Sequence, residues 1–461
     1  MVAREGVGDV MQVSPGHGAG LHGERSSTGG MTSESSWRPI LSGRPAEEAL
    51  EAVDRIATSI RSTTSLPGER DPSLVGGQAG LALLYTWLAR TRPTPQTDVF
   101  ALQCLDQAIE AASSREMNAS FWKGFTGVAW AAEVVDRLLD PDGEDRSEAV
   151  DDALLGLLSG ADLWPAPYDL VVGLTGLGMY ALQRYPRPLA TECLHLVVKR
   201  LHERAQRDEH GLYWWTPPTE IVSEEARRLY PSGRTDLGVA HGVAGPIALL
   251  GAICDAGVEQ ATARPLLEGG VTWLLAHSMP TEEGATFPVW VAPGHQPSPA
   301  RCAWCYGDPG IAAALLMAAR GVGDAGWEQV AVELACRAAE RPRSTTGVVD
   351  ACFCHGAAGL AHIYNRMYQA TGEPSLGRAA RYWLERTLDF YRLARADADA
   401  DTWVQGSTDP AQQEPWTGID IVDGAAGVAL VLLAAATSVE PSWDAMFLLS
   451  APGCDPGTPD D

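Results

Sequence analysis

The apolar residues of this chain recur in short, alanine-rich runs, and each run follows a Gly-x-x-Gly step. Seven steps occur, at intervals of 47, 49, 69, 65, 49 and 68 residues, and their first glycines are Gly77, Gly124, Gly173, Gly242, Gly307, Gly356 and Gly424. The runs cover residues 81–89, 128–138, 177–182, 247–253, 311–319, 360–367 and 428–435. Segments that are apolar on nearly every side are typical of helices buried all round, so the pattern predicts seven inner helices.

A more amphipathic segment follows most of these runs, with charge along one side, as in 327–341 and 375–391. With residues 46–61 counted as the first, seven outer helices are expected. Repeated pairs of a buried and an outer helix indicate a repeat architecture. We expect an all-α fold, an α/α toroid whose helix pairs close into a double ring, because such apolar inner helices need cover on every side. An open solenoid is the alternative, but it should carry polar capping repeats, and the last inner run is the most apolar.

The ends of the chain and two long intervals depart from the repeat. Residues 1–43 are rich in glycine, serine and charge, and we expect them to be a loose tail. The toroid is expected at 44–440, followed by a second tail at 441–461. The longer intervals, 207–241 and 278–306, predict short strand or loop excursions, and loops of this size are usually functional.

Charge and cysteine content narrow the class of protein. The formal net charge is −25, which argues against nucleic acid as a partner because phosphate would be repelled. No run reaches 18 apolar residues, so we expect no integral membrane segment, and without a secretory signal we expect a cytoplasmic protein. Nine cysteines in a long chain of this kind are better interpreted as metal-binding or catalytic groups than as disulfides.

The repeat also aligns the residues that can do chemistry. In a ring of equivalent units, equivalent positions face the same end of the central axis, so residues far apart in sequence converge at one mouth. Residues that lie one, two or four positions before a first glycine are Asp169, His241, Cys305, Cys354, His355 and Asp423. We interpret Asp423 as a helix N-cap and the others as candidates for the site.

Two thiols and one imidazole at such a mouth predict a zinc site. Cys305, Cys354 and His355 would bind Zn²⁺ and leave a fourth position open, which is a catalytic zinc pattern. Helix N-termini add partial positive charge, which favours thiolates. Two alternatives remain at this point. Cys302 and Cys352 could complete a closed structural site, or the spacing of Cys302 and Cys305 could be that of a redox pair.

Four further residues are catalytic candidates. His241 could be a structural histidine, but its position beside the expected metal favours an acid/base role. Asp169 could cap the third inner turn, and we favour an active-site role. Arg301 is either a surface cation or a stabiliser of developing negative charge. Tyr306 could pack or donate a hydrogen bond.

Three motifs, in this order along the chain, resemble those of the lanthionine synthetase C-like cyclases. They are Ala-His-Gly-Val-Ala-Gly at 240–245, Trp-Cys-Tyr-Gly-Asp-Pro-Gly at 304–310 and Cys-His-Gly-Ala-Ala-Gly at 354–359. The resemblance covers about residues 45–440. It implies an α/α toroid with one central Zn²⁺ on Cys305, Cys354 and His355. It also implies acid/base roles for His241 and Asp169, with Arg301 and Tyr306 lining the site.

The activity implied by the resemblance is ring closure in ribosomally made peptides. A peptide cysteine adds to dehydroalanine or dehydrobutyrine, and a lanthionine or methyllanthionine thioether results. Residues 1–43 are too few for a kinase or dehydratase region, so the resemblance implies the stand-alone type, with a dehydrated precursor peptide as substrate and a separate dehydratase. Addition of glutathione to dehydro residues and a non-catalytic peptide-binding toroid are the alternatives.

Overall fold

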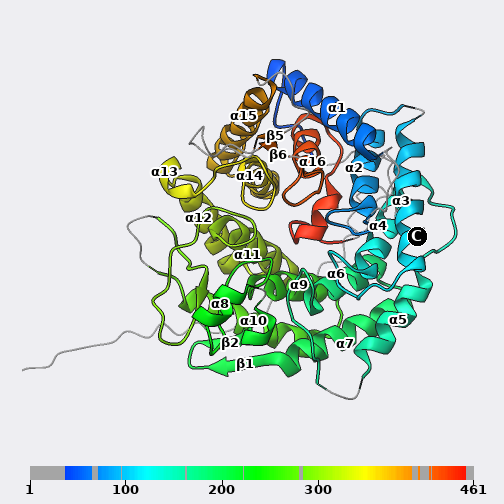
Figure 1. Ribbon diagram of the computed structural model, residues 1–461. Coiled ribbons are helices and arrows are strands. Elements are labelled where there is room, and N and C mark those ends of the chain that lie inside the picture. The colour runs from blue at the N-terminus through cyan, green and yellow to red at the C-terminus, as the bar shows by residue number, and fades with distance from the viewer. Residues whose placement is uncertain are drawn as a thin grey trace, which may run out of the picture.

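The computed structural model describes residues 37–64, 71–94, 96–160, 163–221, 223–279, 284–396, 403–404, 415–416 and 418–452. Two concentric layers of helices form a ring (Figure 1). The inner helices are α2 (Gln78–Thr91), α4 (Phe125–Leu139), α6 (Leu174–Arg184), α9 (Ala244–Asp255), α11 (Asp308–Val322), α14 (Ala357–Thr371) and α16 (Ala425–Ala436). The outer helices are α1 (Arg44–Thr64), α3 (Thr97–Ser114), α5 (Glu148–Leu158), α7 (Pro188–Arg204), α10 (Gln260–Ala276), α12 (Ala325–Ala339) and α15 (Pro374–Ala396). The predicted seven inner and seven outer helices are thus confirmed.

Burial follows the hydrophobic pattern of each layer. Every residue from 425 to 435 of α16 is buried, as an all-apolar helix requires, whereas α12 buries a single stripe. The ring closes where α16 packs against both α1 and α2. Closure gives each inner helix neighbours on both sides, so no capping repeat is needed.

Backbone hydrogen bonds link the seven turns that precede the inner helices. The donor–acceptor pairs run from Val75 N to Trp122 O (3.2 Å), Trp122 N to Val171 O (3.2 Å), Leu170 N to Ala240 O (3.2 Å), Ala240 N to Cys305 O (3.4 Å), Cys305 N to Cys354 O (3.3 Å), Cys354 N to Val422 O (2.9 Å) and Ile421 N to Val75 O (3.0 Å). The last bond returns to the first turn, so the series is a closed circle, which we call the ring of turns. An open solenoid is excluded by this closure.

The first glycine of each step makes these turns possible. A Cβ on Gly307 would lie 2.2 Å from Arg301 O, and one on Gly356 would lie 2.4 Å from Cys352 N. Both distances are far inside van der Waals contact, so the chain can fold back on itself here only without a side chain. The turn then delivers its preceding residues to the mouth of the ring.

The two long intervals form the expected strand and loop excursions. The first contains a hairpin of β1 (Ala205–Asp208) and β2 (Gly211–Trp214), then η1 (Pro218–Glu220) and α8 (Glu224–Leu229). Its last strand, β3 (Thr235–Asp236), pairs with β4 (Trp290–Val291) of the second excursion. The second excursion is also attached to the ring, because the Asp308 carboxylate accepts the N–H groups of Thr286 (2.7 Å) and Phe287 (3.0 Å). The short helix α13 (Arg343–Thr346) and the antiparallel pair of β5 (Trp403–Val404) and β6 (Pro415–Trp416) lie outside these two intervals.

The packed part of the chain extends beyond the expected 44–440 at both ends. Trp37 is buried and its indole N–H donates to Ala434 O (2.8 Å). At the other end, η3 (Ser442–Phe447) lies inside the ring, where Figure 1 draws it in red, and Trp443 and Phe447 are completely buried. The remaining residues of the expected tails, 1–36 and 453–461, lie outside the described residues. Within the described chain, no helix combines the length and apolar character needed to cross a membrane.

Candidate metal centre and catalytic residues

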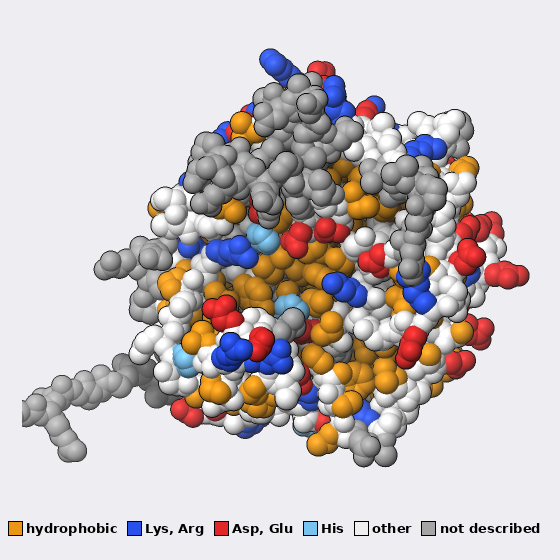
Figure 2. Space-filling view, in the orientation of Figure 1, with side chains coloured by type: hydrophobic (Ala, Val, Ile, Leu, Met, Phe, Trp, Pro, Cys, Tyr) orange, Lys and Arg blue, Asp and Glu red, His pale blue; other side chains and the backbone are white. Residues whose placement is uncertain are grey.

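The turns before α9, α11 and α14 are neighbours in the ring of turns. Residues at equivalent positions of these turns therefore lie side by side at one end of the inner helices. Figure 2 shows a hollow on this face, with a mainly hydrophobic floor and histidine and charged side chains around it. The hollow is where the sequence places its candidate chemistry.

The structure brings the three predicted metal ligands together. The Sγ atoms of Cys305 and Cys354 and a ring nitrogen of His355 all lie within 4.8 Å of one another. A second group among the described residues joins Cys352 and Asp350 to the same histidine. Cys302 belongs to neither group, since its Sγ faces the carbonyl of Ala338 at 3.9 Å. The closed four-ligand site, which needs Cys302, is therefore not assembled among the described residues, and Cys302 and Cys305 are both free thiols.

The surroundings of His355 fit a metal ligand. Its Nδ1 is buried and has no hydrogen-bond partner in the described part of the chain, which is costly for a polar atom. Its Nε2 lies 3.4 Å from Oδ2 of Asp350. A metal-bound histidine commonly turns its second nitrogen toward a carboxylate in this way. Asp350 thus orients the ring and leaves Nδ1 available.

The two thiols and the imidazole of this cluster shift one another's pKa values. A hydrogen bond from Cys354, together with His355 and the charge of Arg301, holds the pKa of Cys305 well below its usual range. The thiol of Cys354, which donates that bond and is partly buried, has a raised pKa. The Asp350 carboxylate raises the pKa of His355 to about 12, ahead of the contribution of Cys305. A divalent ion bound to these three groups would displace the protons that they hold.

His241 and Asp169 form a catalytic-type pair beside this cluster. Nδ1 of His241 lies 2.6 Å from Oδ2 of Asp169, and the other carboxylate oxygen accepts the N–H of Val172 at 2.8 Å. Because the carboxylate accepts, Nδ1 carries the hydrogen. Burial lowers the pKa of His241, but the bond and charge of Asp169 outweigh it and the net shift is upward. The pair can take and return a proton.

Tyr306 and Arg301 lie at the same site, in different ways. The ring of Tyr306 stacks beside that of His241, with centroids 6.2 Å apart and an interplanar angle of 24°. Burial raises the pKa of Tyr306 well above its usual value, so the phenol stays protonated. Arg301 is exposed, and its charge acts on Cys305. Both can offer hydrogen bonds to an anionic group.

The interpretation of Asp423 as a helix N-cap is wrong. The N-cap residue of α16 is Gly424, and no side chain caps that helix. Asp423 is 57% exposed, and its Oδ1 lies 3.8 Å from Nδ1 of His355. Its place one residue before the first glycine is the one that His241 and His355 also occupy, and it puts Asp423 beside His355 instead of at the helix end.

A sequence model described as lanthionine synthetase C-like protein matches residues 68–448. The chain belongs to this family. A solved structure named nisin cyclase is similar to it in fold, with a TM-score of 0.70 and 18% sequence identity, over 87% of this chain and 97% of that chain. No curated protein matches the chain.

Two carboxylates of this family member's site were not predicted from its sequence. They are Asp350, beside His355, and Asp236, which is buried and lies 3.1 Å from Arg234. Burial raises the pKa of Asp236 to about 6, and its charge adds to the upward shift at His241. Both residues lie six positions before a first glycine, where Asp71 and Asn118 also occur. This recurrence of Asp and Asn at one position of the repeat is the signal that could have found them.

Proposed function

We propose that this protein is a zinc-dependent lanthionine synthetase. It adds cysteine thiolates to dehydroalanine or dehydrobutyrine in a ribosomally synthesised peptide and so forms lanthionine and methyllanthionine rings. The observation that carries the proposal is the meeting of Cys305, Cys354 and His355 beside the His241–Asp169 pair, in a chain of the lanthionine synthetase C-like family.

The donor set suits zinc, since two sulfurs and one imidazole nitrogen form a common zinc environment. Zn²⁺ on Cys305, Cys354 and His355 would deprotonate a substrate thiol, whose pKa is ordinarily about 8.5, and so supply the nucleophile. The protein side chains around the cluster then handle the proton and the developing charge.

His241 is proposed to accept the thiol proton on Nε2 while Asp169 steadies the resulting imidazolium at Nδ1. The sulfur forms a bond to the β-carbon of the dehydro residue, and the electron pair of the double bond moves toward the carbonyl oxygen as an enolate. A proton is then delivered to the α-carbon, which balances the addition. Arg301 and the protonated Tyr306 are the groups that would stabilise the enolate oxygen.

The substrate we propose is a precursor peptide already dehydrated by a separate enzyme, in the cytoplasm. A decisive test uses a synthetic peptide with one dehydroalanine and one cysteine, incubated with the zinc-loaded protein with and without glutathione. Cyclisation leaves the peptide mass unchanged but removes its free thiol, so we expect the mass shift by iodoacetamide to disappear.

A matched peptide with alanine in place of dehydroalanine should keep its free thiol. A glutathione adduct in place of a ring would assign the protein to thiol addition. Binding of the peptide without loss of its thiol would favour a non-catalytic toroid.

The pH dependence of the reaction tests the His241–Asp169 pair. His241 must be neutral to accept a proton, and its pKa is raised, so kcat/KM should fall on acidification at a pH above the ordinary value of about 6.5. In the Asp169→Asn variant, the side chain that raises the pKa of His241 is neutral, and burial then lowers this pKa. The acidic limb of the profile should therefore move to lower pH. The maximal rate should also fall about 10²–10³-fold, since the imidazolium loses its partner.

The matched control for this experiment is Asp152→Asn, at an exposed position of the outer helix α5. It should reproduce the wild-type profile. An acidic limb that stays in place in Asp169→Asn would remove Asp169 from its proposed role.

A further inference from the structure

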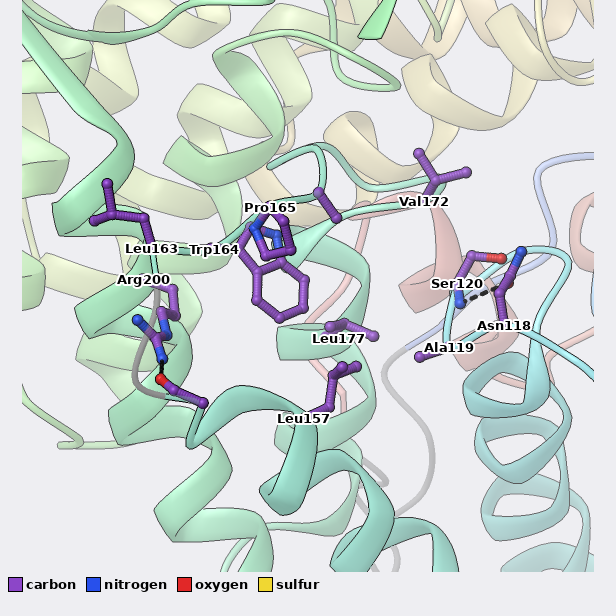
Figure 3. Close-up of a pocket in the computed structure, with 12 residues that line it drawn as sticks. Asn118, Ala119, Ser120, Leu157, Leu163, Trp164, Pro165, Val172, Leu177 and Arg200 are labelled. Carbon is purple, nitrogen blue, oxygen red and sulfur yellow. Dashed lines mark hydrogen bonds between the residues drawn. The ribbon is translucent and has the colours of Figure 1, made fainter. Parts of the chain in front are cut away.

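An apolar pocket of about 530 Å³ opens between the turn before α4 and the segment that joins α5 to α6. Figure 3 shows Leu163 and Arg200 on one side of it and Ser120 on the other, with Leu157 and Leu177 between them. A volume of this size accommodates a small molecule or a large side chain with its neighbouring backbone. None of the roles described so far uses this pocket.

Three exposed apolar side chains line this pocket. Leu163 is 75% exposed, Leu157 46% and Val172 41%, and all three line it. Arg200 is the one charged residue of the lining, and its guanidinium is engaged by Leu158 O at 2.9 Å and Glu203 at 2.7 Å. The pocket therefore presents an uncharged apolar surface to solvent, as ligand-binding surfaces do.

The register of the repeat connects this pocket to the proposed site. Val172 lies one residue before Gly173, the position that supplies His241, Tyr306 and His355 in other turns. Its N–H donates to Asp169, the partner of His241. The turns before α6 and α9 are joined directly through the bond from Leu170 N to Ala240 O. The pocket wall at Val172 is thus joined to the His241–Asp169 pair by hydrogen bonds within and between neighbouring turns.

We propose that this pocket is a specificity subsite, which binds a bulky apolar side chain of the dehydrated peptide close in sequence to the reacting residues. The proposal rests on the function proposed above. A peptide is the occupant because its reacting residues must lie at His241, and a residue a short distance along the same chain reaches the adjacent wall at Val172. The neutral lining selects an apolar side chain over a charged one, because a buried charge would find no partner there.

The test compares two dehydrated peptides that form one ring and differ at a single position beside it, phenylalanine in one and serine in the other. Wild-type protein should cyclise the phenylalanine peptide with about tenfold higher kcat/KM. In Leu157→Glu/Leu163→Glu this preference should disappear, while the serine peptide keeps its rate within about twofold. Leu393→Glu, at a 57% exposed leucine of α15, is the matched control and should keep the preference.

A binding measurement separates this proposal from the function on which it rests. The two peptides are also made with serine for cysteine and alanine for dehydroalanine, and their affinities are compared by calorimetry. Preference for phenylalanine that is lost in the double variant supports the subsite even if no peptide is cyclised, in which case the proposed function fails alone. Equal affinity of both peptides, or a preference that survives the double variant, overturns the subsite. A wild-type dimer in light scattering that the double variant dissociates would also overturn it, since a second copy would then be the occupant.

Discussion

Cys354→Ala should fold like the wild-type protein but retain no zinc and close no rings. The substitution removes one of the three ligand atoms that lie within 4.8 Å of one another and leaves the backbone bonds of its turn intact. Two remaining ligands cannot complete the site, so metal measured by mass spectrometry after dialysis should fall from one zinc per chain to background. Cyclisation should fall with it to the uncatalysed rate, while circular dichroism stays unchanged.

Two other cysteine variants make this result specific. Cys254→Ala, in a buried thiol of α9, should retain its zinc and its activity. Cys352→Ala should also retain zinc, because the proposed ligand set does not include it. If Cys354→Ala keeps a full complement of metal, Cys354 is not a ligand. If Cys352→Ala loses its zinc, the second cluster with Asp350 and His355 is the metal site instead.

His241→Ala should bind zinc normally and yet lose about 10²–10⁴-fold in kcat/KM, the range in which a general acid/base contributes. The imidazole touches the carboxylate of Asp169 and belongs to neither candidate metal group. Removal of the ring therefore leaves the metal cluster complete and takes away the proton acceptor. Metal content and single-turnover cyclisation of the same sample measure the two effects separately.

His241→Ala leaves the carboxylate of Asp169 without its imidazole partner, so a control variant must keep a hydrogen-bond donor there. His241→Gln keeps a hydrogen-bond donor for the buried Asp169 and should fold equally well, with the same loss of rate. His195→Ala, at a side chain 40% exposed on α7, should behave as wild type. Rapid cyclisation by the zinc-loaded His241→Gln and His241→Ala proteins would refute the acid/base role.

Much of the fold followed from a local property of the chain. The glycine steps and the apolar runs recur, and each run by itself is long enough to show that its helix is buried. Because a closed ring places equivalent positions at one mouth, the same repeat also grouped Cys305, Cys354, His355 and His241, which lie up to 114 residues apart. The structure brings these side chains together, and their roles as ligands and catalyst stay predictions.

Short segments outside the hydrophobic repeat gave no sequence signal of their burial. Residues 37–43 and η3 look polar or irregular in the sequence, yet Trp37 and Trp443 are among the buried aromatic residues. Both segments are held by distant partners. Trp37 Nε1 donates to Ala434 O at 2.8 Å, and Phe447 O of η3 accepts from Trp304 Nε1 at 2.9 Å. Contacts over such separations leave no local pattern.

The sequence by itself determined the number of helix pairs, their inner and outer order, and the set of turns that hold the candidate site residues, because these depend on hydrophobic period and on glycine at fixed positions. Only the tertiary structure decided that Asp350 and Asp423 both lie beside His355, and that Leu157, Leu163 and Val172 share one pocket. The reason is physical. The hydrophobic period of a segment indicates how that one helix is buried. The distance between side chains of different turns depends instead on how the whole closed ring packs.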